Sequence, residues 1–325
     1  MQSLPSNDTS CRMLQDQVSG DSRSADSPAT LRRMPSRIRI ADRLTDPAPV
    51  FSFELFPPKS DEGERQLFRT VRELGDLEPD FVSVTYGAAG STRERTLEVA
   101  TRIESELGMT AMVHLACRGH SPDELRVILD RLAEAKVQNV LALRGDGEAS
   151  GVPGEFQYAS ELVRFIRREG YPFCVGAAAY PEGHLECVDR ERDLAYLKAK
   201  VEQGVDFLIT QLFYDNAFYF DFVQRARRAR IRVPIIAGIM PLVGFDQIQR
   251  ITRMCGATVP MRLQLQMERV KDDPEAMQQL GIASATVQCL DLLRRGVPGI
   301  HFYTLNRSRA PQMILAALRG QSAGI

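Results

Sequence analysis

Short apolar segments recur along the chain from residue 50 onward, separated by longer stretches in which polar and apolar positions are mixed. Each segment is continuously apolar rather than strictly alternating, which is typical of parallel strands covered on both faces. Eight segments are therefore predicted to be strands: Val50–Phe56, Phe81–Thr85, Met112–Leu115, Asn139–Leu143, Phe173–Ala179, Phe207–Gln211, Ile235–Ile239 and Ile300–Tyr303.

Amphipathic helices are predicted between these strands. Ser121–Glu124 combines an N-cap serine, a proline at the first helical position and a capping-box glutamate. An apolar stripe at i, i+3, i+4 and i+7 follows, formed by Leu125, Ile128, Leu129 and Leu132. Such a stripe must pack against another element.

The spacing of the strands predicts the fold. Successive strands begin about 27 to 34 residues apart, the length of a βα unit. The last interval is longer and is expected to hold an additional helix near Met277–Arg295. Eight βα units over roughly 250 residues define an α/β fold of the (β/α)8 TIM-barrel type. The alternative is a doubly wound open sheet, but Gly145–Gly151 is the nearest string to its G-x-G-x-x-G motif and has the wrong spacing.

The chain before the first strand differs in composition. Residues 1–47 have few apolar positions and no sustained period, so they are predicted to form a flexible N-terminal extension, with order beginning at Val50. The barrel is expected to occupy residues 48–320, followed by a short tail at 321–325. The extension is rich in Ser and Arg, but its aspartates argue against a transit peptide.

Composition narrows the function classes. The 325 residues carry 41 Lys and Arg against 42 Asp and Glu, and 44% of them are hydrophobic. This balance is typical of a globular protein and argues against a non-specific nucleic-acid binder. No uncharged run is long enough for a membrane span. Six scattered cysteines without a C-x-x-C pair favour a cytoplasmic protein.

Functional groups of such barrels gather at the carboxyl ends of the strands. Polar residues follow several of the predicted strands, and Glu54 even interrupts one of them. Strand geometry can point Glu54 into the barrel, where a carboxyl among phenylalanines stays protonated more easily and can donate a proton. The alternative is an outward-facing Glu54 paired with Lys or Arg, and periodicity alone does not separate the two.

Two further groups are candidate ligand sites. In Arg144–Asp146, Gly145 allows close approach of the backbone, and the aspartate can stabilise positive charge or orient a ring N–H; the alternative is a simple polar turn. Asp193, Tyr196 and Lys200 fall on one predicted helical face, which can hold a phosphate and sugar hydroxyls or can simply be solvated.

Motifs for other chemistries are missing. His184 and Cys187 are three residues apart, but further ligands at metal-site spacing are absent, so no metal is predicted. The G-x-S-x-G elbow of hydrolases and the Walker phosphate loop are absent as well.

The strand-end strings resemble those of the methylenetetrahydrofolate reductase family. Phe53–Lys59 (FELFPPK) resembles the family's F-E-F-F-P-P-K/R opening. Further matching strings occur in order along the chain: Phe81–Gly87, Ala142–Asp146, Ala178–His184, Thr210–Asp215 and His301–Arg307. One such string would be weak evidence, but six strings in the same order along the chain are specific for the family.

The resemblance implies a flavoprotein barrel that reduces 5,10-methylenetetrahydrofolate to 5-methyltetrahydrofolate by ping-pong hydride transfer, supplying methyl groups for methionine synthesis. FAD is the implied cofactor and NADH or NADPH the co-substrate, with the bacterial resemblance favouring NADH. The chain ends soon after the eighth strand, which fits the bacterial type without a regulatory domain. A homo-oligomer with small-molecule substrates, and without nucleic-acid or membrane partners, is expected.

The resemblance also implies roles for individual residues. Glu54 matches the general acid, and Asp146 the carboxylate beside flavin and folate. Gln211, Gln247 and Arg307 match positions that contact the substrate. The positions that match FAD contacts are Thr85, His114, Arg144, Gly145, Asp146, Tyr158, Ala159, Tyr180, His184, Asp193 and Lys200.

Departures from the family pattern leave alternatives. Leu55, Leu212 and Ile251 stand where relatives often have aromatic residues, so stacking of a substrate ring at Ile251 is in doubt. A zinc-dependent folate-pathway methyltransferase would need thiolate ligands, and only Cys117 and Cys187 lie near strand ends. A non-catalytic flavin- or folate-binding relative is the other alternative.

Overall fold

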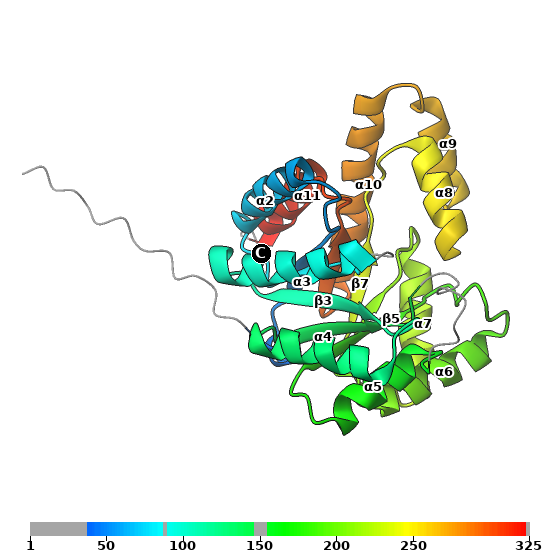
Figure 1. Cartoon of the computed structure of the whole chain (residues 1–325). Coiled ribbons are helices and arrows are strands. Elements are labelled where there is room, and N and C mark those ends of the chain that lie inside the picture. Colours follow the sequence, from blue (N-terminus) through cyan, green and yellow to red (C-terminus); the bar gives the residue numbers. More distant parts are fainter. Residues whose placement is uncertain (1–37, 87–89, 146–154, 323–325) are drawn as a thin grey trace, which may run out of the picture. The chain divides into compact units, whose positions relative to one another are not determined.

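Eight parallel strands close into a barrel in the computed structural model, in the order of the sequence (Figure 1). The structure describes residues 38–86, 90–145 and 155–322. The strands are β1 (Val50–Leu55), β2 (Phe81–Val84), β3 (Ala111–Ala116), β4 (Asn139–Leu143), β5 (Cys174–Ala179), β6 (Phe207–Thr210), β7 (Ile235–Ile239) and β8 (Gly299–Tyr303). Each overlaps a predicted strand, so the predicted (β/α)8 barrel is confirmed.

Helices follow the strands and cover the outside of the barrel. A short helix, α1 (Ile40–Arg43), precedes β1. The others are α2 (Asp61–Gly75), α3 (Gly90–Leu107), α4 (Pro122–Glu134), α5 (Ala159–Arg168), α6 (Arg190–Glu202), α7 (Asn216–Arg228), α8 (Phe245–Cys255), α9 (Met261–Arg269), α10 (Pro274–Arg294) and α11 (Arg309–Ser322).

Helix α4 shows how local sequence sets these elements. The Ser121 hydroxyl accepts a hydrogen bond from the Glu124 backbone N–H, and the Glu124 carboxylate accepts one from the Ser121 backbone N–H. This predicted capping box satisfies donors that the first turn leaves unpaired. Leu125, Leu129 and Leu132 of the predicted stripe are buried against the barrel.

Strand side chains alternate between the barrel interior and the surrounding helices. On β1, Phe53 and Leu55 belong to the large core between strands and helices. Val50 belongs to a separate interior cluster with residues of β2 to β7. Since successive side chains point to opposite faces, Ser52 and Glu54 share the interior face with Val50. Both faces are buried, which explains why the strand sequences are continuously apolar.

Residues 38–43 close the amino-terminal end of the barrel, here called the floor. Ile40 is fully buried in the interior cluster that contains the first inward residues of the strands. Its backbone N–H donates to Asn139 Oδ1 at 2.8 Å, and Asn139 Nδ2 donates to the Ile38 carbonyl at 2.9 Å. Residues 38–43 are therefore ordered although they precede the predicted start at Val50, because long-range contacts rather than a local period hold this segment. Residues 1–37 lie outside the described residues, and the extension there stays a prediction.

The interval between β7 and β8 contains three helices, α8, α9 and α10, which lie together in Figure 1 (yellow to orange). The sequence predicted α10 but not α9. A third apolar cluster forms here, with Ile248 of α8, Met267 of α9 and Met277 of α10 among its buried members. Packing within this cluster holds α8 in place, and α8 carries Gln247 and Ile251.

Candidate active site

The carboxyl end of the barrel, here called the mouth, carries most of the residues predicted for the site. Glu54 ends the inward-facing row of β1 and is only 7% exposed. Its Oε2 lies 3.7 Å from His114 Nε2 and 3.7 Å from His301 Nε2, on β3 and β8. These distances are too long for hydrogen bonds. The structure thus places the Glu54 carboxyl inside the barrel and not on its outer face.

His114 is a neutral neighbour of this carboxyl. Burial lowers its pKa to about 4, although Glu54 acts in the opposite direction. Its Nε2 is buried and has no hydrogen-bond partner within the described part of the chain. Buried polar atoms are nearly always paired. An unpaired ring nitrogen at the mouth therefore indicates a position where a ligand or water completes the pairing.

A polar network that was not predicted from the sequence lies beneath Glu54. His301 Nδ1 lies 2.8 Å from Ser52 Oγ, and its Nε2 lies 3.5 Å from Ser83 Oγ. Beside it, the Tyr303 hydroxyl donates to the Thr210 carbonyl at 2.7 Å. Burial, with a smaller effect of Glu54, raises the pKa of Tyr303 well above its ordinary value. The sequence could have indicated this network, because every second side chain of β1 and of β8 points to the interior of the barrel.

The predicted stripe on α6 meets the end of β5. Asp193 Oδ2 accepts a hydrogen bond from the His184 backbone N–H at 3.2 Å, and the His184 ring contacts Tyr180 edge to face at 4.6 Å. Lys200 Nζ donates to the Ala178 carbonyl at 2.7 Å. Burial lowers the pKa of Lys200 to about 8, with Asp193 opposing. The structure therefore brings four of the predicted cofactor residues together.

The end of β4 forms a second predicted group. Arg144 Nη2 donates to Glu186 Oε1 at 2.7 Å, and this pairing lowers the pKa of Glu186 to about 2. Gly145 has φ of +92°, and a Cβ there would lie 3.0 Å from the Ala116 Cβ, so the turn requires glycine. Asp146, predicted to be catalytic, lies outside the described residues.

Tyr158 and Ala159 stand at the start of α5, close to the end of β4. The Tyr158 side chain is 63% exposed, and Glu161 accepts a hydrogen bond from its backbone N–H at 2.9 Å. The Cys117 thiol lies 3.7 Å from the Arg144 carbonyl and 3.5 Å from the Tyr158 carbonyl. This thiol thus links the start of α5 to the predicted turn after β4.

Thr85 and Gln211 extend the strand ends. The Thr85 backbone N–H donates to the Leu55 carbonyl at 2.8 Å, and the Gln211 N–H donates to the Ala179 carbonyl at 2.7 Å. Gln211 Oε1 accepts a local hydrogen bond from the Leu212 N–H at 2.9 Å. Among the described residues, no acceptor pairs with the Gln211 side-chain NH2 group, so its two donors are available.

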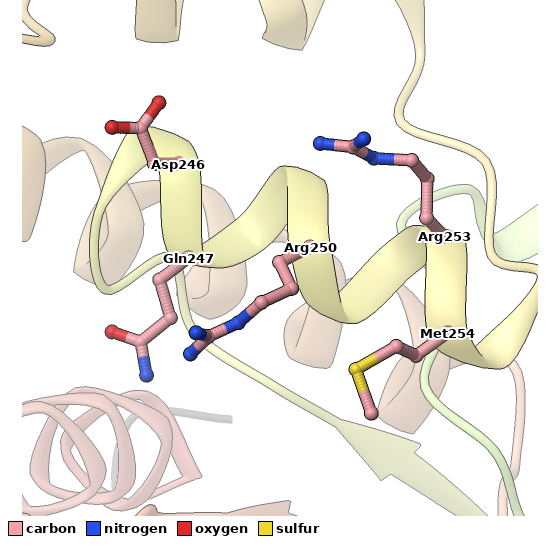
Figure 2. Close-up of a pocket in the computed structure, with 5 residues that line it drawn as sticks. All are labelled: Asp246, Gln247, Arg250, Arg253 and Met254. Carbon is pink, nitrogen blue, oxygen red and sulfur yellow. The ribbon is translucent and has the colours of Figure 1, made fainter.

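Gln247 lies on α8 and borders a hollow of about 850 Å³ (Figure 2). Arg307 is exposed and follows Leu305 and Asn306, which have left-handed φ angles of 51° and 57°. Asn306 holds this turn, because its side chain bonds both the N–H and the carbonyl of Phe56, at 2.8 and 2.9 Å. In the described part of the chain, no hydrogen bond joins Gln247 or Arg307 to the other predicted residues.

The described residues also bear on metal binding and on membrane insertion. Within residues 38–86, 90–145 and 155–322, no three His, Cys, Asp or Glu side chains gather as metal ligands would. Burial raises the pKa of the Cys117 thiol to about 12. None of the helices in the described ranges combines the length and the hydrophobicity that a membrane span requires.

Comparison with known proteins places the whole barrel in one family. Residues 39–319 match the family described as methylenetetrahydrofolate reductase. The chain is 38% identical over 268 residues to the 5,10-methylenetetrahydrofolate reductase of Escherichia coli (strain K12), covering 82% of this chain and 90% of that protein. It is 36% identical over 295 residues to methylenetetrahydrofolate reductase (NADH) 1 of Zea mays, covering 86% and 50%. The chain thus spans about half the length of the plant relatives it matches.

A solved structure shares the fold at lower identity. An uncharacterised protein from Clostridium thermocellum, described as binding two copies of 5-methyl-5,6,7,8-tetrahydrofolic acid, superposes with a TM-score of 0.63. The match covers 87% of this chain and 99% of that chain at 14% sequence identity. At this identity the likeness shows the fold alone.

Proposed function

The chain belongs to the methylenetetrahydrofolate reductase family, and from this we propose that it reduces 5,10-methylenetetrahydrofolate to 5-methyltetrahydrofolate with a nicotinamide dinucleotide as reductant. The observation that carries this proposal is the Glu54 carboxyl, buried at the mouth beside a neutral histidine with an unpaired nitrogen. Such a carboxyl is suited to donate a proton to a substrate nitrogen.

FAD is the proposed cofactor, and the residues at the mouth fit it. Lys200 and Asp193 on α6 offer a cation for phosphate and a carboxylate for sugar hydroxyls. The His114 Nε2 that lacks a partner among the described residues can pair with a polar group of a ligand, and the absence of a side chain at Gly145 allows a ring to approach the backbone. Bound FAD would supply the hydride chemistry.

Glu54 is proposed as the general acid. Protonation of a folate nitrogen by this carboxyl would assist opening of the five-membered ring to the reactive iminium. The carboxyl is buried and lies beyond hydrogen-bond distance of His114 and His301, so neither histidine competes with the substrate for it. The network of Ser52 and Ser83 fixes His301 below it and thereby limits movement of the carboxyl.

The remaining predicted residues are proposed to position substrate and cofactor. Asp146 would stabilise positive charge on the folate and tune the flavin. Gln211 is proposed to donate its free amide hydrogens to the folate ring, and Gln247 and Arg307 to hold the remainder of the substrate. With Ile251 in place of an aromatic residue, α8 offers an aliphatic contact rather than ring stacking.

NADH is the reductant that we propose, acting before the folate in a ping-pong sequence at the same site. The names of two plant relatives include NADH. The product would supply methyl groups for methionine synthesis. A cytoplasmic homo-oligomer is also proposed, on the scattered cysteines and on the family resemblance.

Stopped-flow spectroscopy tests this function. Purified protein should be yellow, and bound flavin should bleach on mixing with NADH and regain its colour on mixing with 5,10-methylenetetrahydrofolate. NADPH in the first step tests the choice of nucleotide. A colourless protein that does not take up FAD, or reduced flavin that the folate does not reoxidise, would contradict the proposal.

A further inference from the structure

The loop between β5 and α6, residues 180–189, contacts the carboxyl end of α8. Both carboxylate oxygens of Glu182 accept from the Thr258 backbone N–H, at 3.0 and 3.1 Å. Beside this contact the Leu185 side chain packs against Gly256, where a Cβ would lie 2.7 Å from the Leu185 Cδ2. Gly256 has φ of +75° and ends α8, so both contacts hold the end of that helix.

The same loop carries groups that are proposed to hold FAD. The His184 backbone N–H donates to Asp193 of α6 at 3.2 Å, and the Glu186 N–H donates to His184 Nδ1 at 3.1 Å. Glu186 also pairs with Arg144, which follows β4. A ligand that binds Asp193 and Arg144 therefore acts on two of the contacts that set the conformation of this loop.

We propose that Glu182 is a positioning residue that couples the binding of FAD to the placement of α8. This inference rests on the proposed function, because it takes FAD as the ligand that acts on the loop. The residues proposed for FAD belong to other elements, whereas Gln247 and Ile251, proposed for the folate, lie on α8. An effect of FAD on α8 therefore needs an intervening element, and the loop 180–189 is joined to both.

The two ends of α8 are held in different ways. Near its amino end, Leu242 and Ile248 are buried members of the apolar cluster that includes residues of α9 and α10. At its carboxyl end, Cys255 and Ala257 are only half-buried members of this cluster, and the hydrogen bond to Glu182 is exposed. An exposed contact can open and close without disturbing the core. The carboxyl end is therefore the end that the loop can fix or release.

Hydrogen exchange of the α8 amides, measured with and without FAD as the added ligand, tests the coupling. In the wild type, FAD should slow this exchange by about 3- to 10-fold, because it fixes the loop that holds the helix end. The substitution Glu182→Ala should abolish the effect of FAD. Glu182→Gln should keep part of it, since its amide oxygen can still accept from Thr258.

The same variants have an expected effect on the reaction. In Glu182→Ala, KM for 5,10-methylenetetrahydrofolate should rise by about 3- to 10-fold, because the helix that carries Gln247 is no longer fixed by bound FAD. Reduction of bound flavin at saturating NADH should stay within about twofold of the wild-type rate. Leu185→Ala removes the apolar part of the contact and should weaken the effect of FAD on the α8 amides.

Glu268→Ala is the matched control. Glu268 lies on α9, in the same segment between β7 and β8, and its carboxylate pairs with Lys271 at 2.6 Å. The substitution removes the same type of side chain from this segment without touching the loop 180–189. It should leave both the effect of FAD on the α8 amides and KM for the folate at their wild-type values.

Failure of this inference differs from failure of the proposed function. A protein that does not take up FAD contradicts both. A protein that binds FAD and reduces the folate, but whose α8 amides exchange at the same rate with and without FAD, overturns the coupling alone. So does a full FAD effect in Glu182→Ala. Faster exchange in Glu182→Ala by the same factor with and without FAD would show that Glu182 stabilises the fold and does not couple the two sites.

Discussion

At the floor of the barrel, buried polar groups are paired with one another, whereas at the mouth a comparable group is left without a partner. Asn139 bonds the backbone of Ile38 and Ile40 through both ends of its amide. Asp80 accepts from the Phe51 N–H at 2.7 Å and pairs with Arg43 at 2.6 Å. His114 Nε2 at the mouth has no such partner among the described residues.

This contrast separates residues that stabilise the fold from residues that are kept for a ligand. Pairing a buried group removes its desolvation cost, so the floor contributes to stability. An unpaired group retains that cost until something binds, so the mouth is less stable than it could be. Variants of the floor should therefore change stability with little effect on chemistry, and variants of the mouth should do the reverse.

The largest effect is expected for Glu54→Gln. Loss of the general acid should slow folate reduction by about 10²- to 10⁴-fold, because proton donation is removed while the shape is kept. Reduction of bound flavin by NADH should remain close to that of the wild type. Stopped-flow traces of the two half-reactions measure both. An equal loss in both would show that Glu54 does not act as the proton donor to folate.

The substitution Ile40→Ala tests the floor of the barrel, at the opposite end from Glu54. Removal of a fully buried side chain should lower the free energy of unfolding by about 2 to 4 kcal/mol. The midpoint of thermal unfolding should fall accordingly, while KM for the folate stays unchanged. Ala41→Gly, at a partly buried neighbouring position in α1, should cost about 1 kcal/mol, since only helix propensity is lost. A raised KM in Ile40→Ala would mean that floor and mouth are coupled.

Asn139→Ala should cost about 1 to 3 kcal/mol of stability. The change leaves the Ile40 N–H and the Ile38 carbonyl without their partner in a buried place. Hydrogen exchange measures this directly, because the Ile40 amide should lose protection while amides of the central strands keep theirs. Unchanged protection at Ile40 would show that water replaces the asparagine without penalty.

The smallest effect concerns pH at Lys200. Its pKa in the folded protein, about 8, lies below the ordinary 10.5, so the folded chain holds fewer protons than the unfolded chain between these values. The contribution of Lys200 to stability without cofactor therefore rises with pH in that window. Affinity for FAD should change in the opposite sense, weakening by up to about tenfold per unit above pH 8, since phosphate binding needs the charged amine.

Lys200→Met should remove both pH dependences. Fluorescence titration with FAD from pH 7 to 9.5, together with thermal unfolding of the apoprotein, measures them. Lys198→Met is the matched control, because Lys198 is partly exposed on the same helix and its ammonium pairs with Glu202 at 3.8 Å. If both variants keep the wild-type pH profile for FAD affinity, Lys200 does not bind the phosphate.

The local sequence pattern was sufficient to predict those helices that have their own amphipathic period. The capping box at Ser121 and the stripe through Leu129 depend only on neighbours in sequence, and the structure has both. Helix α9 was missed between α8 and α10, where a proline, Pro260, and only scattered apolar residues mark its start. Burial of α9 comes from packing on its two neighbours through residues such as Met267, and that packing is not visible in α9 itself.

The amino-acid sequence by itself determined the eight-stranded barrel, the family, and the row of polar residues at the strand ends. These follow from the spacing of the strands, from their continuously apolar segments and from short strings, which are all properties of neighbouring residues. Only the tertiary structure decided that Ile38–Arg43 closes the floor and that His114 stays neutral and unpaired beside Glu54. The hydrogen bonds that hold the floor join residues about 100 positions or more apart in the sequence. A local sequence pattern therefore cannot predict which buried group, such as His114 Nε2, is left without a partner among the described residues.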